Sequence, residues 1–274
     1  MSADPPEPPW QTAGVSVCGA RHLVDQTPCQ DAVQHYADEQ MAIVAVADGH
    51  GDPKYSSSEI GAQIAVDIAC ELLMELSEEI MQTSRPLRQL EEQLMVHFPQ
   101  RIAWEWNRRV RQHAGHTDDS GVWHKDVSRY GTTLLGALIT SKRGLFFQLG
   151  DGDILLMKER DGARQTERVF PLHDDLYGSV THSLCQPGSA RYARIKAIEL
   201  TGSQIMVLSS DGVSDSLQGE PDPYLDVGPW MLSRVNEAGF KGAVAGLPSW
   251  LSELSLRGNG DDATMGLIYW RSKP

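Results

Sequence analysis

Apolar runs that end in aspartate constrain the fold of this chain more than any other feature of its sequence. Residues 41–47 are apolar at every position, which is typical of a central strand covered on both faces of its sheet. Strand-like runs at 145–149 and 205–209 lead into aspartates in the same way. Other short strands are expected at 15–18, 33–36, 132–140, 154–158, 193–200 and 263–270.

Helical periodicity separates the expected strands into groups. Apolar residues at helical spacing predict a helix over 59–80, and a second helix is expected from Pro86, with Pro99 kinking or ending it. Further helices are expected at 229–238 and 247–256. Groups of strands alternate with groups of helices, and no repeat or long linker interrupts them. We therefore expect a single α+β domain with antiparallel strands.

The composition is that of an ordinary globular chain and argues against some partners. The 274 residues are 41% hydrophobic, and 24 Lys and Arg against 37 Asp and Glu leave a net charge of −13. An acidic chain is poorly suited to nucleic acid or an anionic membrane surface. The 4 cysteines form no CxxC pair, and neither a secretion signal nor a membrane-spanning segment is expected. We expect a cytoplasmic monomer.

Acidic residues cluster where the expected strands begin or end. In an antiparallel sheet, the end of one strand and the start of its neighbour share an edge, so these carboxylates could meet there. Asp-Gly is also a common tight-turn sequence, so no single pair is evidence of a site. Converging carboxylates repel one another unless cations neutralise them, and oxygen ligands favour Mg²⁺ or Mn²⁺ over Zn²⁺. The residues concerned are Asp48, Asp151, Asp153, Asp211, Asp215, Asp261 and Asp262.

Two other acidic motifs compete with this interpretation. Residues 48–59 have the length of a calcium-binding loop, but Pro53 stands where that loop needs glycine. The segment from Asp151 to Asp153 resembles the nucleophile motif of aspartyl-phosphate phosphatases, but Leu155 occupies its Thr or Val position. We reject the calcium loop and keep the second as a weaker alternative.

Short motifs occur in a characteristic order along the chain. They are DGHGD at 48–52, GTT at 131–133, LGDGD at 149–153, SSDGVSD at 209–215 and GDDAT at 260–264. Together they resemble the metal-dependent protein phosphatases of type 2C, in particular a bacterial branch. The resemblance covers 12–271 and leaves 1–11 as a proline-rich, flexible tail. It implies an α-β-β-α sandwich, in which two antiparallel β-sheets pack between helices.

The resemblance also implies a set of metal ligands. Two Mg²⁺ or Mn²⁺ ions are expected, with a third, weaker ion as in bacterial members. Asp48 corresponds to the carboxylate that bridges two ions, and the Gly49 carbonyl binds one of them. The other ligands implied by motif position are Asp211 and Asp261 for the first ion, and Asp151 and Asp215, with Asp211, for the third.

Two further positions correspond to catalytic residues of the family. Asp31 matches an aspartate that reaches the metals through water, and His50 matches the proposed general acid. The family's phosphate-binding arginine has no counterpart at its usual place, where this chain has Gln26. Arg21 and His22, slightly upstream, are the candidates for that role.

Other departures from the family pattern involve charge. Gln30 stands where the family has glutamate, Asp153 where it has arginine, and Asp262 where it has asparagine. The two extra aspartates either tighten metal binding or belong to the surroundings of the site. Residues 159–192 are expected to be irregular, and they fall where the family carries a variable flap beside the active site. The resemblance therefore implies that this segment shapes substrate choice.

The function implied is that of a metal-dependent serine/threonine protein phosphatase, which hydrolyses phosphomonoesters with a metal-activated water. Its partner would be a phosphoprotein, either the target of a serine/threonine kinase or such a kinase itself. The substitutions at Gln26 and Gln30 leave open a pseudophosphatase, a metal-binding module that regulates a partner without turnover.

Overall fold

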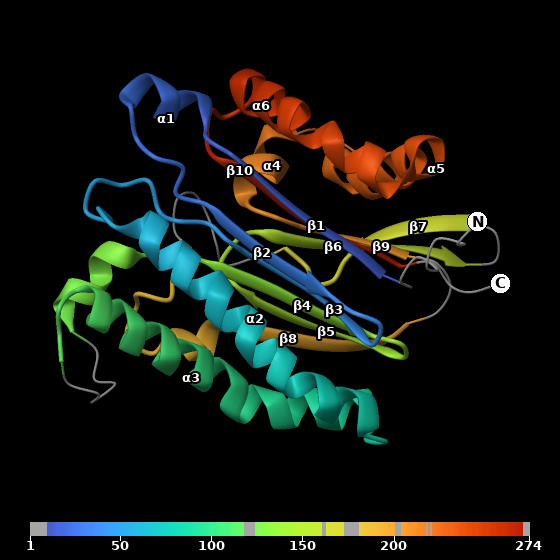
Figure 1. The fold of residues 1–274 in the computed structure, drawn as a ribbon, viewed down its shortest axis with the longest axis horizontal. Helices are drawn as coiled ribbons and strands as arrows, with labels where there is room; N and C mark the ends of the chain where they lie inside the picture. The colour runs from blue at the N-terminus through green and yellow to red at the C-terminus, as the bar shows by residue number, and fades with distance from the viewer. Residues whose placement is uncertain are drawn as a thin grey trace, which may run out of the picture.

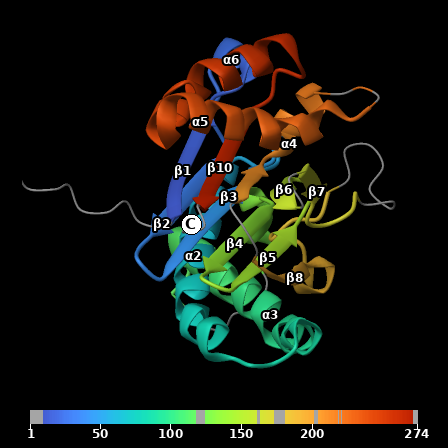
Figure 2. The same ribbon diagram turned by 90° about the vertical axis from the view of Figure 1, so that its right-hand side faces the viewer.

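Two antiparallel sheets lie face to face in the computed structural model, with helices on the outer face of each (Figure 1). The structure describes residues 10–117, 124–160, 163–172, 181–200, 204–217, 219 and 221–270. Figure 2, turned by 90°, shows the same helix, sheet, sheet and helix layers. The predicted α-β-β-α sandwich in a single domain is confirmed.

Each sheet has five strands, and both are assembled from distant parts of the chain. The first follows the order β1 (Trp10–Val17), β10 (Ala263–Trp270), β9 (Gln204–Ser209), β6 (Asp153–Arg160) and β7 (Ala163–Arg168). The second follows the order β2 (Ala32–Ala37), β3 (Met41–Ala47), β4 (Leu134–Thr140), β5 (Arg143–Leu149) and β8 (Arg194–Glu199). Pairing of β1 with β10 joins the two ends of the described chain.

Long helices cover the outer faces. On the second sheet lie α2 (Ser58–Gln82) and α3 (Leu87–His113), and on the first lie α5 (Val227–Ala245) and α6 (Leu247–Arg257). Shorter elements occupy the connections. They are α1 (Ala20–Asp25), α4 (Asp211–Ser214), η1 (Lys125–Tyr130), η2 (Ser189–Tyr192), η3 (Asp215–Leu217) and η4 (Pro223–Asp226).

Strand β3 is apolar throughout because it faces two different cores. Ile43 and Ala45 belong to the core between the second sheet and its helices, whereas Val44 and Val46 belong to the core between the sheets. The sheets approach so closely that a Cβ on Gly266 would lie 2.2 Å from a methyl carbon of Val44. Burial on both faces therefore explains the unbroken apolar run.

The expected flap at 159–192 is only partly irregular, and this corrects the sequence interpretation. Strand β6 continues to Arg160, and β7 pairs with it as the edge of the first sheet. An edge strand faces solvent, so it needs no alternation of apolar and polar residues. The charged side chains of β7 therefore gave no strand pattern in the sequence. Residues 173–180 lie outside the described residues.

Other boundaries also differ from expectation. Strand β1 begins at Trp10, which is 2% exposed and stacks on Trp270, so the expected tail at 1–11 overlaps the first strand. Helix α3 continues through Pro99, so only the alternative in which Pro99 ends the helix is wrong, and α5 continues past a break at Gly239, whose φ is 72°. Residues 1–9 lie outside the described residues, and α1 was not predicted.

Candidate active site

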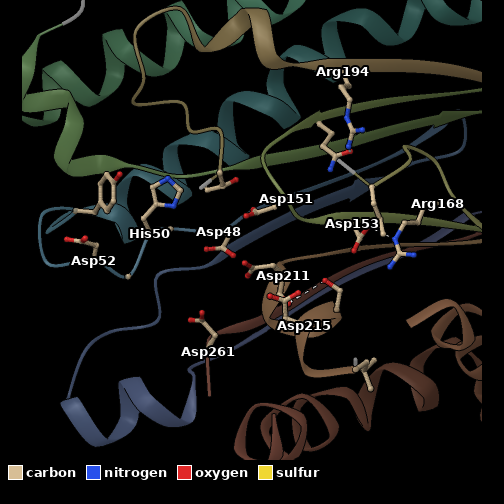
Figure 3. Close-up of a pocket in the computed structure, with 18 of the residues that line it drawn as sticks. Asp48, His50, Asp52, Asp151, Asp153, Arg168, Arg194, Asp211, Asp215 and Asp261 are labelled. Atoms are coloured by element: carbon tan, nitrogen blue, oxygen red, sulfur yellow. Dashed lines mark hydrogen bonds and ion pairs between the residues drawn. The ribbon is translucent and has the colours of Figure 1, made fainter. Parts of the chain in front are cut away.

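A cavity of about 1160 Å³ opens where strands of both sheets end (Figure 3). Asp48 follows β3, Asp151 follows β5, and Asp261 precedes β10. Asp211 and Asp215 begin α4 and η3, just past β9. All five line the cavity, together with Gly49 and His50. The structure thus brings together these five of the seven aspartates predicted to converge; Asp153 also lines the cavity, and Asp262 does not.

The backbone of Asp48 is held by the GTT motif. The Thr133 N–H donates to the Asp48 carbonyl at 2.9 Å, and the Asp48 N–H donates to Thr133 Oγ1 at 3.0 Å. The hydroxyl of Thr132 donates to the same carbonyl at 2.9 Å. Both threonines are buried, so their hydrogen bonds are shielded from competing water. The motif therefore positions the Asp48 carboxylate and does not itself line the cavity.

The glycines that follow Asp48 and Asp211 are needed for close approach. A Cβ on Gly49 would lie 2.4 Å from the Gln30 carbonyl oxygen, and one on Gly212 would lie 1.9 Å from the Asp262 carbonyl oxygen. Neither glycine has a positive φ. The Asp-Gly pairs are therefore not left-handed turns; they let neighbouring segments pack directly against the acidic edge.

Burial and mutual repulsion make the carboxylates difficult to ionise. Burial, followed by the charges of Asp211 and Asp31, raises the pKa of Asp48 well above its usual range. The pKa of Asp211 is raised to about 7, mainly by burial and also by the charges of Asp151, Asp261 and Asp215. Bound cations would favour the ionised form of both groups at neutral pH.

Asp31 lies behind this edge and does not line the cavity. Its Oδ2 atom is buried without a hydrogen-bond partner, and its pKa is raised by burial and by the charge of Asp262. An all-oxygen, repelling donor set with an unpartnered carboxylate oxygen fits hard divalent cations such as Mg²⁺ or Mn²⁺. No three of the cavity's aspartates in the described chain bring ligand atoms within 4.8 Å of one another, so they surround an open space.

His50 lies at the edge of the cavity, packed against Tyr55 with ring centroids 4.7 Å apart. Its backbone N–H donates to the Gly131 carbonyl at 3.1 Å. Burial and the charge of Lys54 lower the pKa of His50 to about 4. Its imidazole is therefore neutral at pH 7 when the cavity holds no anion.

Comparison with known proteins identifies the family. The protein phosphatase 2C family model matches residues 18–252. The chain belongs to the protein phosphatase 2C family. No curated protein sequence is similar enough to count as a match.

Solved structures share the fold of this phosphatase 2C chain at low sequence identity. One is the catalytic domain of the serine/threonine protein phosphatase PstP in complex with two manganese ions, at 17% identity and a TM-score of 0.55, with 96% of this chain and 99% of that chain covered. The S. agalactiae serine/threonine phosphatase has 17% identity and a TM-score of 0.57, covering 96% and 100%. PppA, a regulatory component of T6SS in Pseudomonas aeruginosa, has 18% identity and a TM-score of 0.55, covering 94% and 96%.

The predicted phosphate anchors of this phosphatase 2C chain lie outside the cavity. His22 Nδ1 is 2.9 Å from Asp262 Oδ1, and the Arg21 side chain packs on Gly260. Asp262 also accepts the backbone N–H groups of Gly19 and Gln30, each at 2.6 Å. The negative charge that Asp262 adds to the family pattern is therefore compensated by hydrogen-bond donors.

Asp153, the second unusual aspartate, is compensated by an arginine. Arg168 Nε donates to Asp153 Oδ1 at 2.8 Å (Figure 3). The same guanidinium group contacts Asp222. Arg194 donates to the Gln148 side chain and to the Pro171 carbonyl, both at 2.7 Å. These arginines line the cavity, but sequence reasoning missed them because they lie in or beside the expected flap and in no motif.

No helix in the described part of the chain has the length and apolar character needed to span a membrane.

Proposed function

We propose that this chain is a serine/threonine phosphoprotein phosphatase that depends on Mg²⁺ or Mn²⁺. The observation that carries the proposal is the convergence of uncompensated carboxylates from separate strand ends on one open cavity. The family supports phosphatase chemistry, and the structures of PstP with two manganese ions and of RsbX with magnesium support the choice of cation.

Asp48, the Gly49 carbonyl, Asp211 and Asp261 are proposed to hold two cations, with Asp151 and Asp215 contributing to a third. When bound, the cations would activate water and neutralise charge on the phosphate. Asp48 is suited to bridging because Thr132 and Thr133 hold its backbone while its side chain faces the cavity. Asp31, behind Asp48, would act through an intervening water.

His50 is proposed to protonate the leaving serine or threonine oxygen. It lines the cavity on the side of Asp48 and Asp151 (Figure 3). Its low pKa favours the neutral ring, so a bound phosphate would have to stabilise the imidazolium form. Packing against Tyr55 holds the ring in one orientation, which favours transfer to a single site.

Lys54 is our candidate for phosphate recognition in place of Arg21 or His22. It lines the cavity, and its ammonium group is 3.4 Å from the exposed Asp52 carboxylate, a pair that solvent weakens. Arg168 is engaged with two aspartates, and two Arg194 nitrogens are engaged with oxygens. Among the cavity's cations, Lys54 is therefore the one most available to an anion.

The pseudophosphatase alternative loses part of its support in the structure. Gln30 is buried and donates to Ser58 Oγ at 2.7 Å, away from the cavity lining. Replacement of the family's glutamate there leaves the cavity's carboxylates in place. The aspartyl-phosphate alternative is also weakened, because the second aspartate of its motif, Asp153, is paired with Arg168. A phosphoprotein partner of a kinase pathway, the cytoplasm and a monomer remain our predictions.

The test is hydrolysis of a phosphothreonine peptide with Mn²⁺ or Mg²⁺, compared with EDTA. Asp48→Asn should abolish turnover, whereas Asp52→Asn, in the same loop but half-exposed, should retain most of it. Metal binding without turnover in the unmodified chain would establish the pseudophosphatase instead. Covalent labelling of Asp151 by a beryllofluoride mimic would establish the aspartyl-phosphate mechanism.

A further inference from the structure

A second group of metal-ligating side chains lies at the C-terminal end of α3, apart from the active-site cavity. His116 follows the helix, His124 caps η1, and Asp126 is in the first turn of η1. One ligand atom from each residue lies within 4.8 Å of the others. None of the three lines the active-site cavity.

Two of the three separations between ligand atoms match a tetrahedral metal site. Asp126 Oδ2 is 3.3 Å from His116 Nε2 and 3.2 Å from His124 Nδ1. Two ligands bound to Zn²⁺ at about 2.0–2.1 Å lie about 3.3–3.4 Å apart in tetrahedral geometry. A charge-assisted hydrogen bond would be shorter, at about 2.7–2.9 Å. The His116 contact is a long hydrogen bond in this structure, and its length is also the one that two ligands of a shared cation would have.

The imidazole of His124 is held beside the Asp126 carboxylate by a local hydrogen bond. Its Nδ1 accepts the backbone N–H of Asp126 at 3.3 Å, as a helix-capping side chain does. The same nitrogen is 3.2 Å from Asp126 Oδ2, so a cation placed between these two atoms would be attracted by both. An unprotonated imidazole nitrogen is the form that ligates metals, and a bound ion would replace the backbone N–H as the partner of its single lone pair.

We propose that His116 Nε2, His124 Nδ1 and Asp126 Oδ2 form a Zn²⁺ site, with solvent water as the fourth ligand. Two imidazoles and one carboxylate suit Zn²⁺, whereas the all-carboxylate cavity suits Mg²⁺ or Mn²⁺. The three side chains are 27–44% exposed, so an ion can reach them from solvent. The two sites would thus select different cations by ligand type.

The ion would cross-link the end of α3 to η1. Beside it, His113 Nδ1 already lies 2.9 Å from the hydroxyl of the buried Tyr130, the last residue of η1. The next residue, Gly131, accepts the His50 N–H. Zn²⁺ bound here would therefore stabilise a segment that leads directly into the active-site edge.

The experiment titrates tag-free protein with Zn²⁺, and separately with Co²⁺ as a spectroscopic probe, while excess Mg²⁺ occupies the carboxylate cavity. We expect one Zn²⁺ per chain, a Co²⁺ visible spectrum of a four-coordinate site, and a higher Tm with Zn²⁺. His116→Ala and His124→Ala should each weaken binding by more than about 100-fold, because even outer partners of metal ligands contribute about 10–100-fold. His97→Ala, an exposed histidine of α3, is the matched control and should bind like the parent.

Unchanged stoichiometry in a His116→Ala/His124→Ala double variant that retains the parent fold would overturn the proposal. A competing cluster formed by Cys18, His22 and Asp262 provides a second decisive comparison. If Cys18→Ser removes Zn²⁺ binding and the double variant does not, the ion binds there instead. Asp126→Asn, which preserves side-chain size, should reproduce the loss seen with the histidine variants.

Discussion

Aspartates at the two ends of the active-site cavity differ in whether an arginine of the chain pairs with them. At one end, burial and neighbouring aspartates raise the pKa of Asp48 and of Asp211, and no described Lys or Arg forms an ion pair with either. At the other, Asp153 is paired with Arg168, which also contacts Asp222. An aspartate at a strand end is therefore a candidate ligand only where no arginine or backbone donor already satisfies it.

The causes of the pKa shifts differ between the two ends in the same way. Neighbouring aspartates add to the effect of burial at Asp211 and raise its pKa to about 7. Burial also raises the pKa of Asp153, but the charge and hydrogen bond of Arg168 oppose that rise. External cations would stabilise the first end, whereas Arg168 already compensates the charge at the second.

The largest expected difference between the two ends is in the catalytic activity of aspartate variants. Asp211→Asn should lower metal-dependent phosphatase activity by about 10³-fold or more, since even outer partners of metal ligands contribute about 10–100-fold. Asp153→Asn should lower it by less than about 10-fold, because Asp153 is engaged with Arg168. Steady-state assays with saturating Mn²⁺ measure both. Equal losses in the two variants would contradict the division of the cavity.

The compensated end should instead matter for stability. Arg168→Met leaves Asp153 buried and unpaired, and we expect a loss of about 3 kcal/mol in the free energy of unfolding. Urea denaturation measures this loss. The double variant Arg168→Met/Asp153→Leu should recover part of it because no lone charge remains. An unchanged midpoint in the single variant would show that the pair is dispensable.

The uncompensated end should make the metal-free protein sensitive to pH. An unfolded aspartate has a pKa of about 4, whereas burial and neighbouring aspartates raise the pKa of Asp211 to about 7 in the folded, metal-free chain. Between these values the folded state binds more protons, so stability falls as pH rises. In EDTA, Tm should be several degrees lower at pH 8 than at pH 5. Excess Mg²⁺ should remove most of that difference, and a Tm that rises with pH in EDTA would contradict the prediction.

The smallest expected effect concerns substrate recognition. Lys54→Ala should raise KM for a phosphopeptide about two- to five-fold, with little change in kcat, because an exposed cation contributes modestly. Lys142→Ala, an exposed lysine beside β5 and outside the cavity lining, is the matched control. A fall in kcat with unchanged KM would assign Lys54 to a different role.

Much of the fold could be predicted because its signals are local. The apolar run of β3 and the periodicity of α2 each reflect burial that a single segment records on its own. Strand β7 was not predicted because an edge strand can be rich in charged residues. Its Arg168 lies in no recognisable motif. For the same reason, the candidate site was predicted from the aspartates but not from the arginines that flank it.

The phosphate-binding residue shows most directly what could not be predicted from the sequence. Proximity in sequence to Asp31 suggested Arg21 and His22, but folding directs His22 to Asp262 and packs Arg21 on Gly260. Lys54 reaches the cavity instead, from the loop after β3. Distance along the chain carries little information about which side chains share an edge between two sheets.

The linear pattern of apolar runs, glycines and aspartates was sufficient for the strand ends and for the acidic character of the site. This pattern could not distinguish an aspartate available to a cation from one already paired with an arginine, because Asp48 and Asp153 follow similar strand-like segments. That distinction depends on which donors packing brings within about 3 Å of each carboxylate. Arg168 comes to Asp153 from a neighbouring strand, and no arginine comes to Asp48 among the hydrogen bonds of the described residues.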